Sequence, residues 1–332
     1  MKVVDTHAHF LPGDMVARLR SNQQPDGTTI EMREGAPWVV HRQGFAYPLE
    51  PHFHDVEARL RHMAGNGITH AVLSVPPTFF FYWAPAAEAI DAAGQLNDSL
   101  AQAAAAGQGR LSAVATLPMQ DVDAAVRELR RAVIELGLKG AEIGPSVEGQ
   151  PLDGPAGEAV LATAAELNVP LIIHPYYVGS DPILHDFYMT NLLGNPWQTT
   201  LCATRLILSG TLDRLPTLRI LLVHGGGYLP TAAGRLNHGA RVRPELAQFK
   251  GDPSDYLRRF YYDTLTHDAT GLRNLIGQVG PDRIVFGSDT PFDMGTTCLD
   301  GQLGSSPLPS TTRQALSYAN AEALFSWDIA DD

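Results

Sequence analysis

The chain has 332 residues, 44% of them hydrophobic, and can therefore bury a large core either as one barrel or as two ordinary domains. Its formal net charge of −12 excludes the clustered lysine and arginine side chains that a nucleic-acid-binding surface needs to neutralise phosphates. Its two cysteines, Cys202 and Cys298, lack CxxC spacing and indicate neither a disulfide framework nor a thiolate metal site.

At the start of the chain, Met1 and Lys2 lead directly into Val3 and Val4, with no apolar leader segment. No later stretch holds about 18 consecutive apolar residues, the length needed to span a membrane. We therefore expect a soluble, cytoplasmic protein with neither a membrane nor a nucleic-acid partner.

Short β-branched apolar runs alternate with longer segments of helical spacing, which is typical of parallel βα units. In chain order, the predicted strands are residues 2–9, 70–75, 111–117, 138–143, 170–174, 219–224, 260–264 and 283–287. The predicted helices between and after them are residues 56–67, 86–106, 122–136, 156–167, 198–212, 231–241, 271–278 and 311–324.

Eight such pairs predict an α/β fold, a closed (β/α)8 TIM barrel. An open doubly wound sheet is the alternative, but no GxGxxG motif follows the first strand as a dinucleotide-binding fold would require. We expect a single domain over residues 1–332. Residues 11–54 carry several glycines and prolines and little periodicity, so we predict that they form an insertion after the first strand that lies over the active site.

Histidines and one aspartate stand at the carboxyl ends of the predicted strands, which converge on the catalytic face of such a barrel. His7 and His9 lie on the first strand, one residue apart, so both side chains project to the same side. His174 ends the fifth strand, and Asp289 follows the eighth. Three imidazoles and a carboxylate suit Zn²⁺, with Mn²⁺, Fe²⁺ or Co²⁺ as possible substitutes, and leave one position for water.

His224 follows the sixth predicted strand and opens a His-Gly-Gly-Gly run, where the missing side chains leave room for a ligand or for backbone. A fourth imidazole could be a further ligand or a base. Because four ligands are already assigned, we expect His224 to hydrogen-bond the metal-bound water and to move protons.

An aromatic run at residues 79–83 follows the second strand on the same face and ends in Trp83. It could line a pocket for a planar or unsaturated substrate, or it could pack beneath a loop. His41, His52 and His54 fall in the insertion, and no spacing assigns them to the pocket.

Taken together and in this order, five strings make the chain similar to the aminocarboxymuconate-semialdehyde decarboxylase branch of the amidohydrolase superfamily, over nearly its whole length. They are residues 4–12, which contain His7 and His9, residues 173–175, residues 224–227, residues 234–239, which contain Arg235, and residues 287–292. The resemblance implies Zn²⁺ held by His7, His9, His174 and Asp289, with His224 in proton transfer beside Asp289. It further implies that Phe292 is a pocket aromatic and that Arg235 reaches across a homodimer interface to the substrate carboxylate of the neighbouring subunit.

Two departures from that family concern the substrate. Tyr47 aligns with a second substrate arginine, for which Arg42 could substitute only if the insertion shifts register. Tyr188 and Tyr176 stand where the family has tryptophans. These changes suggest a different substrate, with one carboxylate where the family decarboxylase takes two.

We therefore expect a metal-dependent, non-oxidative decarboxylase, a carbon–carbon lyase that acts on a small aromatic or unsaturated carboxylic acid. The alternative is a hydratase, or a hydrolase of an ester, lactone or amide, that uses the same metal-bound water. A barrel that serves only as a binding protein or scaffold would leave the histidines and Asp289 at the strand ends without a role.

Overall fold

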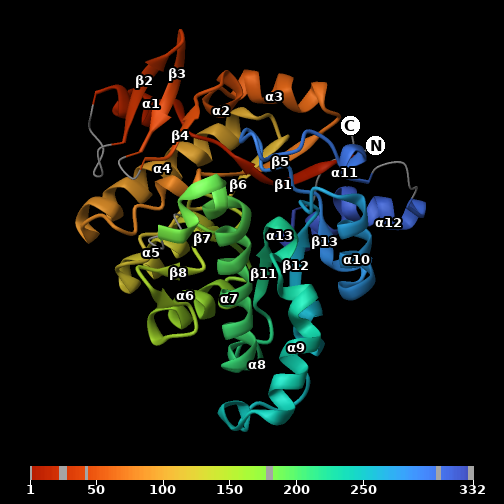
Figure 1. Cartoon of the computed structure of the whole chain (residues 1–332). Coiled ribbons are helices and arrows are strands. Elements are labelled where there is room, and N and C mark those ends of the chain that lie inside the picture. The colour runs from red at the N-terminus through yellow and green to blue at the C-terminus, as the bar shows by residue number, and fades with distance from the viewer. Residues whose placement is uncertain (1, 22–27, 42–43, 177–181, 304–307, 328–332) are drawn as a thin grey trace.

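Eight short parallel strands surround a common axis in the computed structural model, which describes residues 2–21, 28–41, 44–176, 182–303 and 308–327 (Figure 1). They pair as two sheets, in the orders β1-β5-β6 and β13-β12-β11-β10-β7. The strands are β1 (Val4–His9), β5 (His70–Ser74), β6 (Leu111–Ala113), β7 (Ala141–Ile143), β10 (Pro170–Ile173), β11 (Arg219–Leu222), β12 (Phe260–Asp263) and β13 (Ile284–Val285).

Two parallel bridges join these sheets into a closed barrel. Ala115, just beyond β6, pairs with Ala141 of β7, and Ala8 of β1 pairs with Thr290, beyond β13. At the second bridge the backbone N–H of His9 donates to the carbonyl of Thr290 at 2.8 Å. The predicted (β/α)8 barrel is therefore confirmed, and all eight strands fall within the segments expected from the sequence.

Helices follow the strands and cover the outside of the barrel (Figure 1). Aspartates cap three of them: the side chains of Asp55, Asp121 and Asp268 accept backbone N–H groups in the first turns of α3, α5 and α10. The covering helices are α3 (Val56–Gly65), α4 (Ala86–Ala106), α5 (Val122–Ile134), α6 (Pro155–Glu166), α7 (Asn195–Leu208), α8 (Thr211–Arg214), α9 (Leu229–Val242), α10 (Ala269–Val279), α11 (Leu299–Leu303), α12 (Ser310–Gln314) and α13 (Asn320–Phe325).

Two predicted helices differ in detail from the structure. The helix expected at 198–212 is divided into α7 and α8 at Gly210, whose φ of +74° ends α7 in a left-handed turn that glycine adopts without strain. The last helix, expected at 311–324, contains the π-helical turn η9 (Ala315–Ala319) between α12 and α13.

The interior of the barrel is apolar below the strand ends. One cluster gathers inward-facing residues of six strands or the residues just beyond them, with α13 packed against them. Its members are Val4, Val72, Val114, Ile172, Leu221, Val223, Val285, Ala321, Leu324 and Phe325. The lower part of the barrel is thus a filled core that fixes the positions of the strands, whose upper ends remain available for polar residues.

The predicted insertion contains an antiparallel sheet of β2 (Thr29–Arg33), β3 (Ala36–Val40) and β4 (Ala46–Pro48), flanked by α1 (Gly13–Arg20) and α2 (Pro51–His54). In Figure 1 this sheet lies at one side of the molecule, beside α1. The Tyr47 hydroxyl contacts Thr78 Oγ1 at 3.0 Å and His41 Nε2 at 3.1 Å. That this segment lies over a substrate, and that the chain is one domain, stay predictions.

A buried polar network supports the closure between β13 and β1. Asp5 accepts the backbone N–H of Ser288 at 3.0 Å and the Ser288 hydroxyl at 2.5 Å. Arg59, from α3, is fully buried and donates to Thr290 Oγ1 at 3.2 Å and to the carbonyl of His9. Among the described residues, no helix is long and apolar enough to cross a membrane.

Replacing Arg59 with methionine should lower the free energy of unfolding by about 3 kcal/mol, because Thr290 Oγ1 and the carbonyl of His9 would lose a buried guanidinium donor, and Asp5 would lose a nearby positive charge. Urea denaturation of the two proteins measures this difference. The control is Arg61→Met on the same helix, because Arg61 forms only an exposed pair with Glu57 at 3.6 Å. Equal losses in the two variants would contradict a special role for Arg59.

Candidate metal centre

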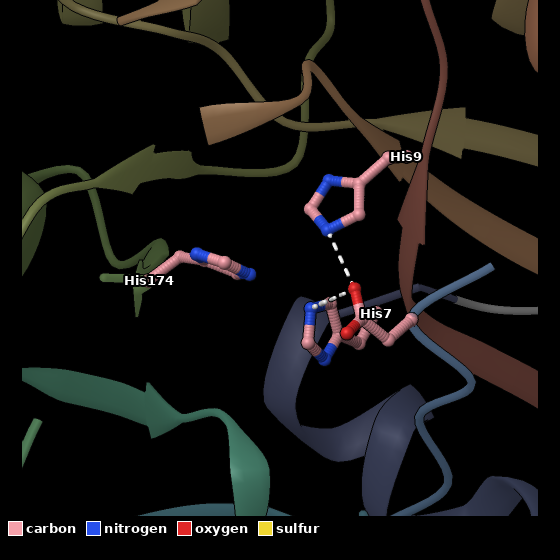
Figure 2. Close-up of side chains that lie close together, drawn as sticks. His7, His9 and His174 are labelled. Carbon is pink, nitrogen blue, oxygen red and sulfur yellow. Dashed lines mark hydrogen bonds and ion pairs between the residues drawn. The ribbon is translucent and has the colours of Figure 1, made fainter. Parts of the chain in front are cut away.

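Four side chains meet at the carboxyl ends of the barrel strands. His7 and His9 come from β1, His174 follows β10, and Asp289 follows β13. One ligand atom from each lies within 4.8 Å of the others, and all four residues are buried. In Figure 2 the three imidazoles point toward one common space. Asp289 Oδ1 lies 3.1 Å from His9 Nε2 and 3.5 Å from His7 Nε2.

The outer ring nitrogens show which atoms are free to bind a cation. His7 Nδ1 donates to Asp263 Oδ2 at 2.8 Å, and His174 Nδ1 to the carbonyl of Pro175 at 2.7 Å. His9 Nδ1 lies 3.1 Å from the carbonyl of Val75. When these rings are neutral and Nδ1 is the donor in each, Nε2 carries a lone pair directed into the centre. Within the described chain, the buried Nε2 atoms of His7 and His174 have no hydrogen-bond partner, so the site fits a divalent cation.

The charges around the centre favour an ionised Asp289. Burial would raise the pKa of this carboxyl, but the neighbouring His7, His224 and His9 side chains hold it well below its usual range. Burial also lowers the pKa of His174 well below its usual value, and the nearby imidazoles lower it further. For His7, burial acts to lower the pKa, but Asp289 and Asp263 outweigh it and raise the pKa to about 9. The centre therefore offers an anionic ligand beside imidazoles.

His224 lies at the edge of this cluster, in the turn η5 (His224–Gly226) after β11. Its ring centroid is 5.2 Å from that of His174 and 5.3 Å from that of His7, and its Nε2 lies 3.6 Å from Asp289 Oδ2. The glycines after it are needed sterically. A Cβ on Gly226 would lie 2.5 Å from the Tyr262 ring, and one on Gly227 would lie 2.2 Å from the carbonyl oxygen of Pro196.

Sequence reasoning missed two buried carboxylates next to the centre. Asp263, the last residue of β12, binds His7 as described and also accepts the backbone N–H of His224 at 2.9 Å. Glu142 lies in β7, where burial raises its pKa and the charges of His9 and His7 lower it. Both residues lie in predicted strands, Asp263 next to the end of its strand, so the signal that selected the histidines could also have selected them.

The predicted substrate-binding residues differ in their burial and in their contacts with the centre. The Phe292 ring lies 5.2 Å from the His9 ring and 5.1 Å from the Tyr47 ring. Tyr188 is half exposed, and burial followed by the charges of Asp293 and Asp289 raises its pKa. Arg235 is exposed on α9, and Arg42 lies outside the described residues.

The aromatic run is mostly core. Phe79, Phe80, Phe81 and Tyr82 are buried, so packing accounts for these four side chains. Trp83 is the exception: it is partly exposed, and its ring stacks on Tyr176 at 6.2 Å, close to the loop that carries His174. Of the run, only Trp83 therefore stays a candidate for contact with a substrate.

A cavity of about 350 Å³ opens beside His224, between the segment before α7, the start of α9 and one face of α10. Its lining includes Leu192, Tyr228 and Met294, and no lysine or arginine from the part of the chain that the structure describes. Four carboxamide residues contribute to it: Asn191, Asn195, Asn274 and Gln278. The cavity therefore offers hydrogen bonds but no permanent positive charge.

Comparison with known proteins gives consistent results. The family model described as amidohydrolase (Amidohydro_2) matches residues 4–327. The 2-amino-3-carboxymuconate-6-semialdehyde decarboxylase of Dictyostelium discoideum is 32% identical, over 96% of this chain and 90% of that protein. The gamma-resorcylate decarboxylase of Rhizobium sp. strain MTP-10005 is 32% identical, over 82% of this chain and 88% of its own length.

A solved structure of a dihydroxybenzoic acid decarboxylase from Polaromonas sp. JS666 superimposes on 98% of this chain with a TM-score of 0.76. The alignment covers 97% of that protein at 26% sequence identity. That structure holds manganese and the inhibitor 2-nitroresorcinol. The likeness therefore extends over the whole barrel, including the strand ends that carry the candidate centre.

We expect His174→Ala to lower the metal content of the purified protein by at least tenfold, because it removes one of four donors, whereas His224→Ala should keep the ion. Elemental analysis after gel filtration measures the metal content per chain. The control is His238→Ala, at an exposed position of α9. An equal loss of metal from the His174 and His224 variants would make His224 a ligand.

Proposed function

The chain belongs to the amidohydrolase family, and we propose that it is a metal-dependent, non-oxidative decarboxylase of an aromatic or unsaturated carboxylic acid. The observation that carries this proposal is the convergence of imidazole lone pairs and an ionised carboxylate beside His224. Both curated relatives described above, each 32% identical, are decarboxylases by name. The enzyme is accordingly a carbon–carbon lyase.

We assign the ion as Zn²⁺, held by His7, His9, His174 and Asp289, because three nitrogen donors and one oxygen donor form a set that zinc prefers. Mn²⁺, Fe²⁺ and Co²⁺ accept the same donor types, and manganese occupies the related Polaromonas enzyme. When bound, the ion supplies a Lewis acid that polarises oxygen atoms of the substrate.

His224 moves the proton that the reaction requires. Its Nε2 lies beside Asp289 Oδ2, at 3.6 Å, and its side chain is partly exposed, so it can reach a substrate at the centre. The carbon that bears the carboxylate takes a proton from the His224 imidazolium and becomes tetrahedral. The bond to the carboxylate carbon then breaks, CO₂ leaves, and the bonding electron pair returns to the unsaturated system. Asp289 helps to hold the protonated His224 in place.

The substrate is planar and carries a single carboxylate. Phe292, Tyr188 and Trp83 supply aromatic walls on the side of the centre where a conjugated ring or chain would lie. Among the described residues, the lining of the cavity beside His224 includes no lysine or arginine, so this wall offers no counter-charge to a second carboxylate. Residues 11–54 cover the substrate on the His9 side of the centre, where Tyr47 contacts Phe292 and Phe292 contacts His9.

The enzyme acts as a homodimer in which Arg235 of one subunit binds the substrate carboxylate of the other. Arg235 is exposed on α9 and forms no hydrogen bond or ion pair within the described part of its own chain, and α9 extends away from the barrel (Figure 1). Large exposed apolar side chains nearby give a surface that a second copy would cover: Ile183, Phe187, Leu192, Leu193, Trp197 and Leu201. Arg42 is the other candidate for this carboxylate.

The metal-loaded protein should release CO₂ from at least one acid in a panel of hydroxybenzoates and muconate-type acids. A chelator should abolish this activity, and added Zn²⁺ or Mn²⁺ should restore it. Mass spectrometry of the products separates the alternatives. A gain of water in place of a loss of CO₂ would identify a hydratase or hydrolase, and turnover that survives complete removal of the metal would exclude the proposed chemistry.

If Arg235 acts in the neighbouring subunit, the inactive variants Arg235→Ala and His224→Ala should regain about a quarter of wild-type activity after mixing and subunit exchange. This value follows because half of the dimers would be mixed, and each mixed dimer would have one complete site. Native mass spectrometry verifies the exchange. Arg241→Ala serves as the control, because Arg241 lies on the same helix in an exposed pair with Asp252. Proven exchange without recovery would place Arg235 outside the shared site.

A further inference from the structure

Asp263 is fully buried at the end of β12, and its carboxylate accepts four N–H groups. Oδ2 accepts the Nδ1–H of His7 at 2.8 Å and the backbone N–H of His224 at 2.9 Å. Oδ1 accepts the backbone N–H groups of Gly225 at 2.7 Å and Leu265 at 3.1 Å. A single oxygen atom is therefore shared by a ligand of the proposed ion and by the backbone of the residue that moves the proton.

The contact with His7 fixes which ring nitrogen can bind an ion. An ionised carboxylate only accepts hydrogen bonds, so His7 has to carry its proton on Nδ1. In the neutral ring Nε2 is then the nitrogen with the lone pair, and it faces the cluster, where it lies 3.5 Å from Asp289 Oδ1. The ring also cannot rotate without breaking this buried hydrogen bond.

The contact with the turn holds an uncommon backbone conformation. His224 has a φ of +54°, in the left-handed region that residues with a side chain rarely adopt, and Gly225 follows at +61°. Both N–H groups point to the same carboxylate. The Asp263 side chain thus fixes the direction in which the His224 ring leaves the backbone.

We infer that Asp263 is a positioning residue that couples metal binding to proton transfer, because one carboxylate fixes both the His7 ring and the His224 turn. The expected effect of this coupling on turnover rests on the proposed function. The effects of Asp263 on metal binding and on the turn can be measured without any substrate, so a failure of the proposed reaction would be distinguishable from a failure of this coupling.

Asp263→Asn is the diagnostic substitution, because it keeps the shape but replaces one acceptor oxygen with an NH₂ donor. If the amide nitrogen faces His7, the ring has to move its proton to Nε2, which then cannot bind the ion. If it faces Gly225 and Leu265, two donors meet and the turn is released. In the first orientation the amide nitrogen also faces the backbone N–H of His224, and in the second the neutral amide oxygen is a weaker acceptor for His7 than a carboxylate. Either orientation therefore weakens both the His7 contact and the turn.

For Asp263→Asn, we expect the affinity for Zn²⁺, measured by competition with a chromophoric chelator, to fall 10- to 100-fold. Hydrogen–deuterium exchange of the peptide that covers residues 222–228 should become at least tenfold faster in the metal-free protein. Asp268→Asn is the matched control: it lies in the same loop and caps α10, and asparagine caps helices equally well, so neither quantity should change.

At saturating Zn²⁺, the kcat of Asp263→Asn should stay at least tenfold below that of the wild type, while KM changes little, because the ion is restored but His224 is not. Three outcomes would overturn the coupling. They are full recovery of kcat with excess metal, an unchanged rate of hydrogen–deuterium exchange in the turn, and an unchanged affinity for the metal. Should Asp263→Asn fail to fold, Asp263→Glu keeps the charge and shifts the carboxylate by one methylene. The same pair of losses, smaller in size, is then expected, and the absence of either would overturn the inference.

Discussion

The hydrogen bonds on the outer nitrogens of three buried imidazoles are the constraint on which the rest of the structure depends. His7, His9 and His174 each bind an oxygen atom of the protein through Nδ1, so their Nε2 lone pairs all face one small space. Lone pairs and a carboxylate that face one another in a buried site repel, and in the metal-free protein a proton on His7, whose pKa is raised to about 9, offsets part of this repulsion. The protein has to hold this arrangement in place, and a cation turns the repulsion into attraction.

The barrel provides the rigidity that such an arrangement requires. The ligands stand at the ends of strands whose lower halves pack into a filled apolar core, closed by α13. The donors and acceptors that aim the ligands come from the ends of other barrel strands, as Asp263 does for His7 and the Val75 carbonyl does for His9. The exposed apolar residues between residues 183 and 201 lie outside this core, in the connection after β10 and in α7.

The sequence was sufficient to predict the barrel, because alternating strands and amphipathic helices are local patterns, and strand ends in this fold converge on one face. The convergence of His7, His9, His174 and Asp289 followed from the same rule. The hydrogen bonds of Asp263 and the buried clamp of Arg59 could not be predicted, since they depend on side-chain directions between strands distant in the chain. The break at Gly210 was missed because the helical spacing of apolar residues continues past it, although the backbone of Gly210 leaves the helical conformation.

The closure between β1 and β13 determines the order of events when the protein is made. His7 and His9 belong to the first strand, and Asp289 follows the last, on opposite sides of the seam that the pairing of Ala8 with Thr290 closes. A nascent chain has no complete site until Asp289 has left the ribosome. The proposed ion can therefore gain its full set of ligands only after the seam has closed, and it would then join the first and last strands of the barrel, so that opening of the seam and release of the ion would become a single event.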